Sequence, residues 1–363
     1  MATATRAATR LGAVVDALVR LPLGAVVVGA LVLRLAAGVA FPAADTETYE
    51  FGWRARNIAG GEGYVYFHDD PEGRVHPEPD QPGELLQSAA MPPVYTGVTA
   101  VATWAADSHA GTVWGVRLLN LAAAAASVVL IEALARRLVG GRAARLAAIG
   151  LALYPALVYM STQVSAANVY LPVELALFLS LIAASRSSSW RRWLAAGLVL
   201  GVLCLLRAEA VVLIPLAAAW LVWTARGTPV GRARTGLVAV FAVAAIMLPG
   251  AWMVRNSLEL GEPVPTVTTT SGLNLWHGNH AGASGSQKSV ELPPEMAERI
   301  SRIDAGDAFE LRRDEVFRSE ALSYMADDPV GTLVRDVKKV GLLLVADVHD
   351  PRSLNPAYLA SYA

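Results

Sequence analysis

Carboxylate side chains cluster directly after the first long apolar run of the chain. Residues 44–64 read ADTETYEFGWRARNIAGGEGY, with Asp45 first among the acids and Glu47 two residues later. A carboxylate at a membrane surface can take the proton of a hydroxyl group as that group attacks a substrate, which is general base catalysis. The plainer alternative is a solvated acidic rim. From the residues alone, both interpretations of Asp45 stay open, a catalytic base and part of a solvated rim.

Composition defines the setting of this acidic stretch. Apolar residues make up 54% of the 363-residue chain and charged residues only 17%, whereas about a quarter of a soluble domain is charged. We therefore expect an all-α polytopic membrane protein. A net charge of -1 argues against nucleic acid as a partner, because no basic face is available to neutralise phosphates. The single cysteine, Cys204, excludes a disulfide within the chain.

The apolar runs divide the chain into spans and loops of a single domain, 1–363. The first span, 21–41, is long enough to cross the roughly 30 Å hydrocarbon layer and is interpreted as an uncleaved anchor. A first outer loop, 42–111, contains a Pro/Gly-rich tip at 69–84. Six spans then lie within 112–252, at 112–135, 143–160, 169–184, 194–206, 211–224 and 236–252. A second outer loop, 253–332, carries a helix at 307–325 and a helix start at Asp328 and Pro329. The last, partial span is 333–346, followed by a polar tail, 347–363.

Clusters of arginine orient these spans by the positive-inside rule. The clusters are Arg136, Arg137, Arg142 and Arg145; Arg186, Arg191 and Arg192; and Arg226, Arg232 and Arg234. All are predicted to be cytoplasmic, so both long loops face outward from a cell membrane. If the apolar stretch 91–106 also crossed, the first cluster would be forced outside. We therefore predict that 91–106 is a helix in the outer interface, started by Pro92 and Pro93.

Sequence landmarks along the chain support a family resemblance. They are Asp45, Tyr49, Asn57, Gly61, Gly63 and Tyr64, then PPVY at 92–95, GVRLLN at 115–120, YPALVYMS at 154–161, LLRAEA at 205–210, PGAWMVRN at 249–256, GLNLWHGNHAGASG at 272–285, and DEVFRSEALSYMADDP at 314–329 leading to Lys338 and Lys339. In this order they resemble the GT-C superfamily of membrane glycosyltransferases, specifically the protein O-mannosyltransferase and aminoarabinose transferase group (glycosyltransferase family 39).

The resemblance implies a GT-C-type helix bundle and a reaction. One sugar would pass from a polyprenyl-phosphate carrier in the membrane to an extracytoplasmic acceptor, which is a protein, lipid or glycan, with inversion at the anomeric carbon. Asp45 matches the acid of the family's first loop and receives the role of base. Fixed cations would stabilise the charge on the departing phosphate, and the candidates are Arg207, Arg255, Lys338 and Lys339. Each has an alternative as a headgroup contact, and Arg207 has a second one in pairing with Glu209.

Further binding candidates surround these charges. Asn274, Trp276 and Asn279 would shape a turn and a sugar pocket, and Glu47, Tyr49 and Tyr64 are added to the substrate-binding set. A divalent metal ion has only weak candidates in Glu47 and His277, whose spacing fits no fixed ligand pattern. Within the spans, the charges of Arg34 and Glu174 are expected to face a polar cavity or each other.

Two departures from the family pattern keep alternatives open. Relatives carry a second acid before the fourth span, where this chain has Ala166, Ala167 and Asn168. The chain also ends soon after its last apolar stretch, whereas relatives continue with more spans. The alternatives are a catalytically inactive binding or assembly subunit, transfer of a preassembled glycan, and a transporter, which the large outer loops and few intramembrane charges disfavour. The residues identify neither the sugar nor the acceptor.

Overall fold

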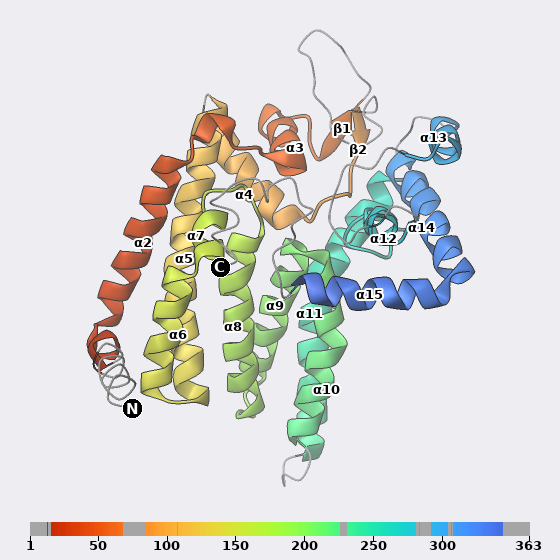
Figure 1. The fold of residues 1–363 in the computed structure, drawn as a ribbon. Helices are drawn as coiled ribbons and strands as arrows, with labels where there is room; N and C mark the ends of the chain where they lie inside the picture. The colour runs from red at the N-terminus through yellow and green to blue at the C-terminus, as the bar shows by residue number, and fades with distance from the viewer. Residues whose placement is uncertain are drawn as a thin grey trace. The chain divides into compact units, whose positions relative to one another are not determined.

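The computed structural model describes residues 13, 16–67, 85–106, 108–225, 231–280, 283, 292–303, 306 and 308–343. The predicted loop tip at 69–84, the tail at 347–363 and Arg226 lie outside these residues, as do the side chains of Arg232 and Arg234. The described chain is almost entirely helical (Figure 1). Together with its apolar helices, this makes it an all-α polytopic membrane protein, as the composition predicts.

The described elements follow one another in this order. The helices are α2 (Leu23–Ala40), α3 (Tyr49–Gly60), α4 (Pro93–Trp104), α5 (His109–Leu138), α6 (Gly141–Leu153), α7 (Pro155–Met160), α8 (Ala167–Ser185), α9 (Trp190–Leu206), α10 (Leu213–Ala225), α11 (Gly231–Glu259), α12 (Ser271–Gly278), α13 (Pro294–Ser301), α14 (Phe309–Asp327) and α15 (Pro329–Leu343). Two 3-10 helices, η1 (Ala43–Asp45) and η2 (Ala208–Val212), and two strands, β1 (Val65–Phe67) and β2 (Leu85–Gln87), complete the described set.

These elements form two compact units. Unit 1 comprises Met1–Glu47 and Ser108–Leu248, and unit 2 comprises Thr48–Asp107 and Pro249–Ala363. Each unit is therefore built from two separate stretches of sequence. The two segments interpreted as outer loops from the sequence supply most of unit 2. That both units work as one domain stays a prediction.

Four helices in the described part of the chain are long and apolar enough to cross a membrane. They are Leu23–Ala40, His109–Leu138, Ala167–Ser185 and Gly236–Glu259, which match the predicted spans 21–41, 112–135, 169–184 and 236–252. The predicted span 194–206 lies in α9, which has 17 residues. The predicted span 211–224 begins in η2 and continues as α10.

The predicted span at 143–160 is not one continuous helix, and its crossing of the membrane stays a prediction. Helix α6 ends at Leu153, Tyr154 has extended dihedral angles (φ -61°, ψ 115°), and α7 starts at Pro155. Proline has no N–H and disfavours helical geometry in the residue before it, so the chain breaks here. The break leaves the carbonyl groups at the end of α6 without helical partners. Arg34, buried within α2, donates to the carbonyl oxygens of Leu151 (3.3 Å) and Ala152 (2.8 Å).

The two ends of the unit 1 helices differ in charge. At one end, the buried Glu132 of α5 accepts hydrogen bonds from Arg136 and Arg145, and Arg145 also donates to the carbonyl oxygen of Leu21. The end of α5 and the starts of α6 and α2 therefore lie together. Arg186, which follows α8, and Arg191 and Arg192, in the first turn of α9, are exposed.

At the opposite end of unit 1, the start of α5 lies beside the turn that follows α2. His109 Nε2 is 2.9 Å from the carbonyl oxygen of Thr46. Residues 48–107 therefore leave unit 1 and return to it at the same end. Helix α4, within this segment, has 12 residues and is about 18 Å long, which is shorter than the hydrocarbon layer. The placement of 91–106 in the outer interface stays a prediction.

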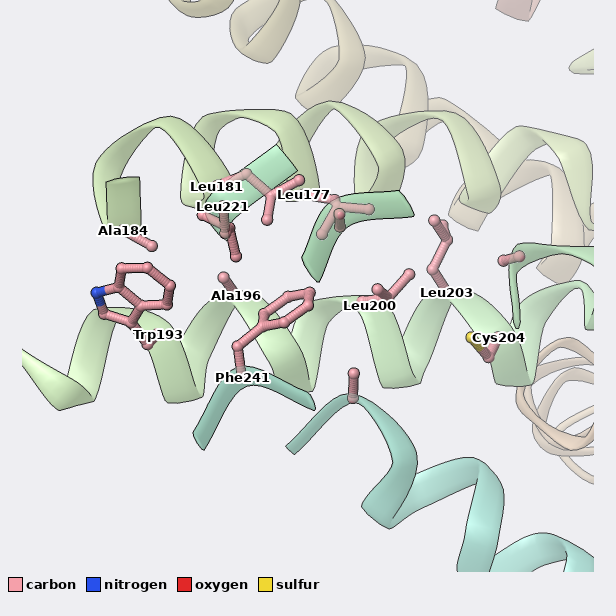
Figure 2. Close-up of a cluster of buried hydrophobic side chains, with 13 residues drawn as sticks. Leu177, Leu181, Ala184, Trp193, Ala196, Leu200, Leu203, Cys204, Leu221 and Phe241 are labelled. Atoms are coloured by element: carbon pink, nitrogen blue, oxygen red, sulfur yellow. The ribbon is translucent and has the colours of Figure 1, made fainter. Parts of the chain in front are cut away.

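Small residues allow α9 and α11 to approach closely within unit 1. A Cβ on Gly197 would come within 2.4 Å of the Phe241 carbonyl oxygen, and one on Gly201 within 3.2 Å of the Ala245 carbonyl oxygen. This spacing of small residues is typical of tightly packed membrane helices. Figure 2 shows the apolar cluster around this contact, with Trp193, Leu200 and Cys204 from α9 and Phe241 from α11.

Unit 2 joins the two segments that were predicted to be outer loops around a buried carboxylate. Strands β1 and β2 pair antiparallel, with Tyr66 opposite Leu86, and both pack on Trp276 and Phe317. Glu310 of α14 is 1% exposed and pairs with Arg54 of α3, which is 3% exposed, at 3.3 Å. The same carboxylate accepts from Ser88 Oγ (2.8 Å), Ala89 N (2.8 Å) and Thr269 Oγ1 (2.7 Å). A fully hydrogen-bonded acid therefore links four segments that are distant in sequence.

Candidate active site

Asp45 lies in the short 3-10 helix η1, which ends the turn after α2. The turn is closed by Thr46, whose hydroxyl donates to the Pro42 carbonyl oxygen at 3.1 Å. Asp45 and Glu47 are both exposed, whereas Thr46 between them is buried. The alternation directs the two carboxylates to solvent and the threonine into unit 1. The backbone at Asp45 is thus fixed while its carboxylate stays accessible.

Arg117 of α5 holds this turn from inside unit 1. It is 2% exposed and donates to Thr46 Oγ1 (3.0 Å), the Gly38 carbonyl oxygen (2.7 Å) and the Thr162 carbonyl oxygen (3.0 Å). Its guanidinium also lies 5.1 Å from the ring centre of Trp114. Asn120, one turn later, donates to the carbonyl oxygens of Ser161 and Gln163 at 3.0 Å each. The GVRLLN landmark therefore ties the Asp45 turn to α5 and to the end of α7.

Arg207 is exposed at the same end of unit 1, after α9. It forms an ion pair with Glu209 and lies 5.7 Å from the ring centre of Tyr170. The structure thus contains the pairing that the sequence offered as the alternative to phosphate binding. An exposed pair of this kind is easily broken, so it does not prevent Arg207 from meeting an anion.

Asn168 is one of the three residues at the position where the resemblance predicts a second acid. Its side-chain amide donates to the carbonyl oxygens of Met160 (2.9 Å) and Ser165 (3.3 Å). The amide thus closes the turn before α8. These contacts are structural, and a carboxylate could not make them because it has no hydrogen to donate.

In unit 2, Arg255 and Tyr64 lie together. The Arg255 guanidinium is 5.4 Å from the ring centre of Tyr64 and 4.9 Å from that of Trp252, and it donates to the Ser88 carbonyl oxygen at 2.8 Å. Tyr64 donates to the Met91 carbonyl oxygen at 2.7 Å. Burial raises the pKa of Tyr64 to about 12, so its hydroxyl remains a hydrogen-bond donor at neutral pH. The two rings keep the guanidinium in place at the end of α11.

The NLWHGN landmark forms α12, which packs on α14. Gly272 is required there, because a Cβ would come within 2.1 Å of the Asp314 carbonyl oxygen. Asp314 accepts from the Leu273 N–H at 2.9 Å at the start of α12. Trp276 is buried and stacks on His280 with ring centres 4.6 Å apart. The Asn279 amide nitrogen donates to the Leu275 carbonyl oxygen at 2.9 Å, while its side-chain oxygen is buried with no hydrogen-bond partner among the described residues.

Lys339 of α15 reaches the end of α12. Its Nζ lies so close to Gly278 that a Cβ there would be 3.3 Å from it, and it also donates to Asp336 at 2.8 Å. Lys338 is exposed. Asn274 is exposed on α12, and Tyr49 begins α3. Unit 2 therefore brings Lys339 to the signature segment and Tyr64 to Arg255, and unit 1 carries Asp45, Glu47 and Arg207.

The metal candidates remain weak. Glu47 belongs to unit 1 and His277 to unit 2. Among the residues that the structure describes, no group of three or more His, Cys, Asp or Glu side chains could hold a metal ion. Burial lowers the pKa of His277 and also that of His280, which is lowered further by the neighbouring His277. Neutral imidazoles are thereby favoured at the end of α12.

Several positioning residues were not singled out from the sequence. Arg117 was quoted only within a landmark, although a charged residue inside a long apolar run is a signal in itself. Glu310 and Ser88 carried no such signal, because both lie in polar segments and meet only through the tertiary fold. Asp314 has a clearer pattern, since it lies four residues before Arg318 and pairs with it at 2.8 Å.

The fold and these sites define an all-α membrane protein in which one buried arginine, Arg117, holds an exposed acidic turn. Residues 92–254, from the start of α4 to near the end of α11, match the family model described as dolichyl-phosphate-mannose-protein mannosyltransferase. The match confirms the predicted resemblance and supports a mannosyltransferase-like glycosyltransferase. A comparison with curated proteins gives no match.

Proposed function

We propose that this protein is an inverting glycosyltransferase that moves one sugar from a polyprenyl-phosphate carrier to an acceptor outside the cytoplasm. The observation that carries the proposal is the Asp45 turn. Its backbone is held by Arg117 and His109 through Thr46, and its carboxylate is exposed. The match of residues 92–254 to a mannosyltransferase family supports the same class of reaction.

The two ends of unit 1 support the side of the membrane. At one end Arg136 and Arg145 pair with Glu132 and Arg142 pairs with Asp16, which precedes α2, and the Asp45 turn lies at the other end. Basic residues at helix ends favour the cytoplasmic side. The Asp45 end is then extracytoplasmic, where a lipid carrier presents its sugar after translocation.

In the proposed reaction, the Asp45 carboxylate accepts the proton of the acceptor hydroxyl. The freed oxygen lone pair forms a bond to the anomeric carbon on the face opposite the phosphate. The bond between that carbon and the phosphate oxygen breaks, and its electron pair leaves with the carrier as a polyprenyl phosphate. A positioned base typically contributes about 10²- to 10⁴-fold to such a step. Inversion follows from attack on the opposite face.

The departing phosphate gains negative charge, which cations near the site would stabilise. We assign this role first to Lys339, because its Nζ lies at the end of the signature helix α12. Arg255 is the second candidate, since Tyr64 and Trp252 hold its guanidinium in one orientation. Lys338 and Arg207 are exposed and belong to the same proposed set. Glu47, Tyr49, Asn274, Trp276 and Asn279 are proposed to border the sugar and acceptor.

A second candidate function is a catalytically inactive binding or assembly subunit. The observation that favours it is Asn168, whose amide is used in a local turn where the resemblance predicts an acid. If that acid is needed for transfer in this family, the chain would bind the lipid-linked donor without turning it over. Transfer of a preassembled glycan is a third outcome of the same test.

The test supplies purified protein in vesicles with three radiolabelled donors and an extract of candidate acceptors. The donors are a polyprenyl monophosphate sugar, a polyprenyl pyrophosphate oligosaccharide and a nucleotide sugar. The proposal predicts transfer from the first donor alone. Transfer from the pyrophosphate donor would replace it with glycan ligation. Binding of the first donor without transfer to any acceptor would favour the inactive subunit.

A further inference from the structure

Helix α15 carries a regular apolar stripe. Val330, Leu333, Val334, Val337 and Val340 recur at spacings of three and four residues, which places them on one face of a helix. These five side chains are between 49% and 73% exposed. Their contacts with the rest of unit 2 are therefore few.

The opposite face of α15 is polar and packs on the protein. Thr332 is buried there. Arg335 donates to Thr332 Oγ1 (2.7 Å) and to the Tyr324 hydroxyl of α14 (3.3 Å), and its guanidinium is 4.7 Å from the Tyr324 ring centre. Lys339, on the same face, reaches Gly278. The helix is thus held by its polar residues.

This arrangement is the reverse of that in a helix on a water-soluble domain. Such a helix buries its apolar stripe and exposes its charged face. An exposed stripe of five large apolar residues in water would be unfavourable, and contiguous patches of this kind mark contact surfaces. Residues 328–331 fix the helix start, since the Gly331 N–H donates to Asp328 Oδ1 at 2.8 Å. Figure 1 shows the sharp turn from α14 into α15 at this point of the chain.

Three features favour lipid as the occupant of the stripe. Unit 2 includes the last turns of α11, the end of a helix able to cross a membrane. Val254 and Leu258 of those turns are exposed as well, so the unit borders the bilayer. Lys338 lies at the edge of the apolar stripe and is exposed, where its ammonium group could reach lipid phosphates while its stem stays among apolar groups.

We propose that α15 contacts the lipid bilayer, with its apolar stripe in the lipid and its polar face against unit 2. Lys338 and Lys339, although adjacent, then have different surroundings. Lys338 contacts headgroups, and Lys339 faces the α12 signature segment. The proposal rests on exposure and packing alone and does not depend on the proposed function.

The test measures the depth of two positions in the full-length protein. In a Cys204→Ala background, Val337→Cys and Glu320→Cys variants are labelled with a fluorophore and placed in vesicles of phosphatidylethanolamine and phosphatidylglycerol. Glu320, exposed on α14 of the same unit, is the matched control. Iodide reports access from water, and nitroxide-labelled lipid reports contact with the bilayer. Leu333→Cys provides a second position on the stripe.

The proposal predicts that the label at 337 is quenched strongly by nitroxide lipid and several-fold less by iodide than the label at 320. The label at 333 should behave in the same way. Iodide quenching at 337 equal to that at 320 would show that the stripe faces water and would overturn the proposal. Protection at 337 from both quenchers would show that protein covers the stripe, either a second copy or another part of this chain, and would overturn it as well.

Discussion

Arg117 in unit 1 and Arg54 in unit 2 are both almost fully buried, yet their charges meet different partners. Arg117 donates to two backbone carbonyl oxygens and a threonine hydroxyl. Arg54 instead meets the Glu310 carboxylate and Ser88. Arg34 resembles Arg117 in this respect, because it donates to carbonyl oxygens at the break between α6 and α7. The arginines inside the spans thus donate to carbonyl oxygens at helix ends and breaks, whereas the arginine of unit 2 pairs with a carboxylate.

The difference follows from what each setting allows. Within a bilayer a second charge is costly to insert, but a helix break supplies carbonyl oxygens that need donors in any case. In unit 2 the packed segments are far apart in sequence, and the single carboxylate of Glu310 connects four of them through hydrogen bonds. Arg34 and Arg117 therefore stabilise helix ends in unit 1, and Glu310 stabilises the packing of distant segments in unit 2.

The largest stability effect is expected from Glu310→Ala. The change leaves Arg54 buried without its carboxylate, and breaking a buried pair in this way costs roughly 3 to 5 kcal/mol. The midpoint of thermal unfolding in detergent measures it. Glu320→Ala is the control, because its ion pair with Arg299 is about half exposed and such pairs contribute roughly 0 to 1 kcal/mol. Equal shifts for the two variants would contradict the central role of Glu310.

Within unit 1, Gly197→Ala tests close helix packing instead of charge. The added Cβ would lie 2.4 Å from the Phe241 carbonyl oxygen and 2.7 Å from the Ala244 Cβ. Overpacking of this kind costs roughly 1 to 3 kcal/mol. Gly150→Ala on α6 is the matched control, since no atom lies within 4 Å of its added Cβ. If both variants melt at the same temperature, α9 and α11 are not in close contact.

Arg117→Met and Arg34→Met separate a positioning role from a structural one. Each removes the donor of two interhelical carbonyl oxygens, and an unsatisfied buried acceptor costs roughly 1 to 3 kcal/mol, offset in part because a buried charge is also removed. Only Arg117 contacts Thr46 beside Asp45. We therefore expect the transfer rate per folded molecule to fall for Arg117→Met and to be kept by Arg34→Met. Equal transfer rates in the two variants would show that Arg117 does not position Asp45.

The smallest effect is a dependence of unit 2 on pH. Burial lowers the pKa of His277 and of His280 below the ordinary value of 6.5. The unfolded chain then binds more protons as the pH falls through about 6.5, so stability is full above that pH and decreases below it. Unfolding midpoints between pH 5 and 8 measure the trend. A His277→Gln, His280→Gln double variant should flatten it, and an unchanged slope in that variant would assign the effect elsewhere.

Much of unit 1 could be predicted from the sequence, whereas unit 2 could not. Apolar length alone identifies α2, α5, α8 and the membrane part of α11, and Asp328 and Pro329 predict the start of α15. The break at Pro155 was missed because hydropathy does not register a single proline. The Glu310 network and the contact of Lys339 with α12 depend on segments joined only by the fold. The same limit applies to Arg34, expected to meet a cavity or Glu174, which found carbonyl oxygens created by a break that had not been predicted.

The role of Asp45 as the base is tested by the rate at which an Asp45→Asn variant transfers sugar from the polyprenyl monophosphate donor. Asparagine keeps the size of the side chain but cannot accept the proton. We expect the transfer rate of Asp45→Asn to be lower by about 10²- to 10⁴-fold. Asp45→Glu should keep partial activity. Glu62→Gln, which changes an exposed acid beyond α3, should leave the rate unchanged. Transfer by Asp45→Asn at the rate of the unaltered protein would contradict the assignment of Asp45 as the base.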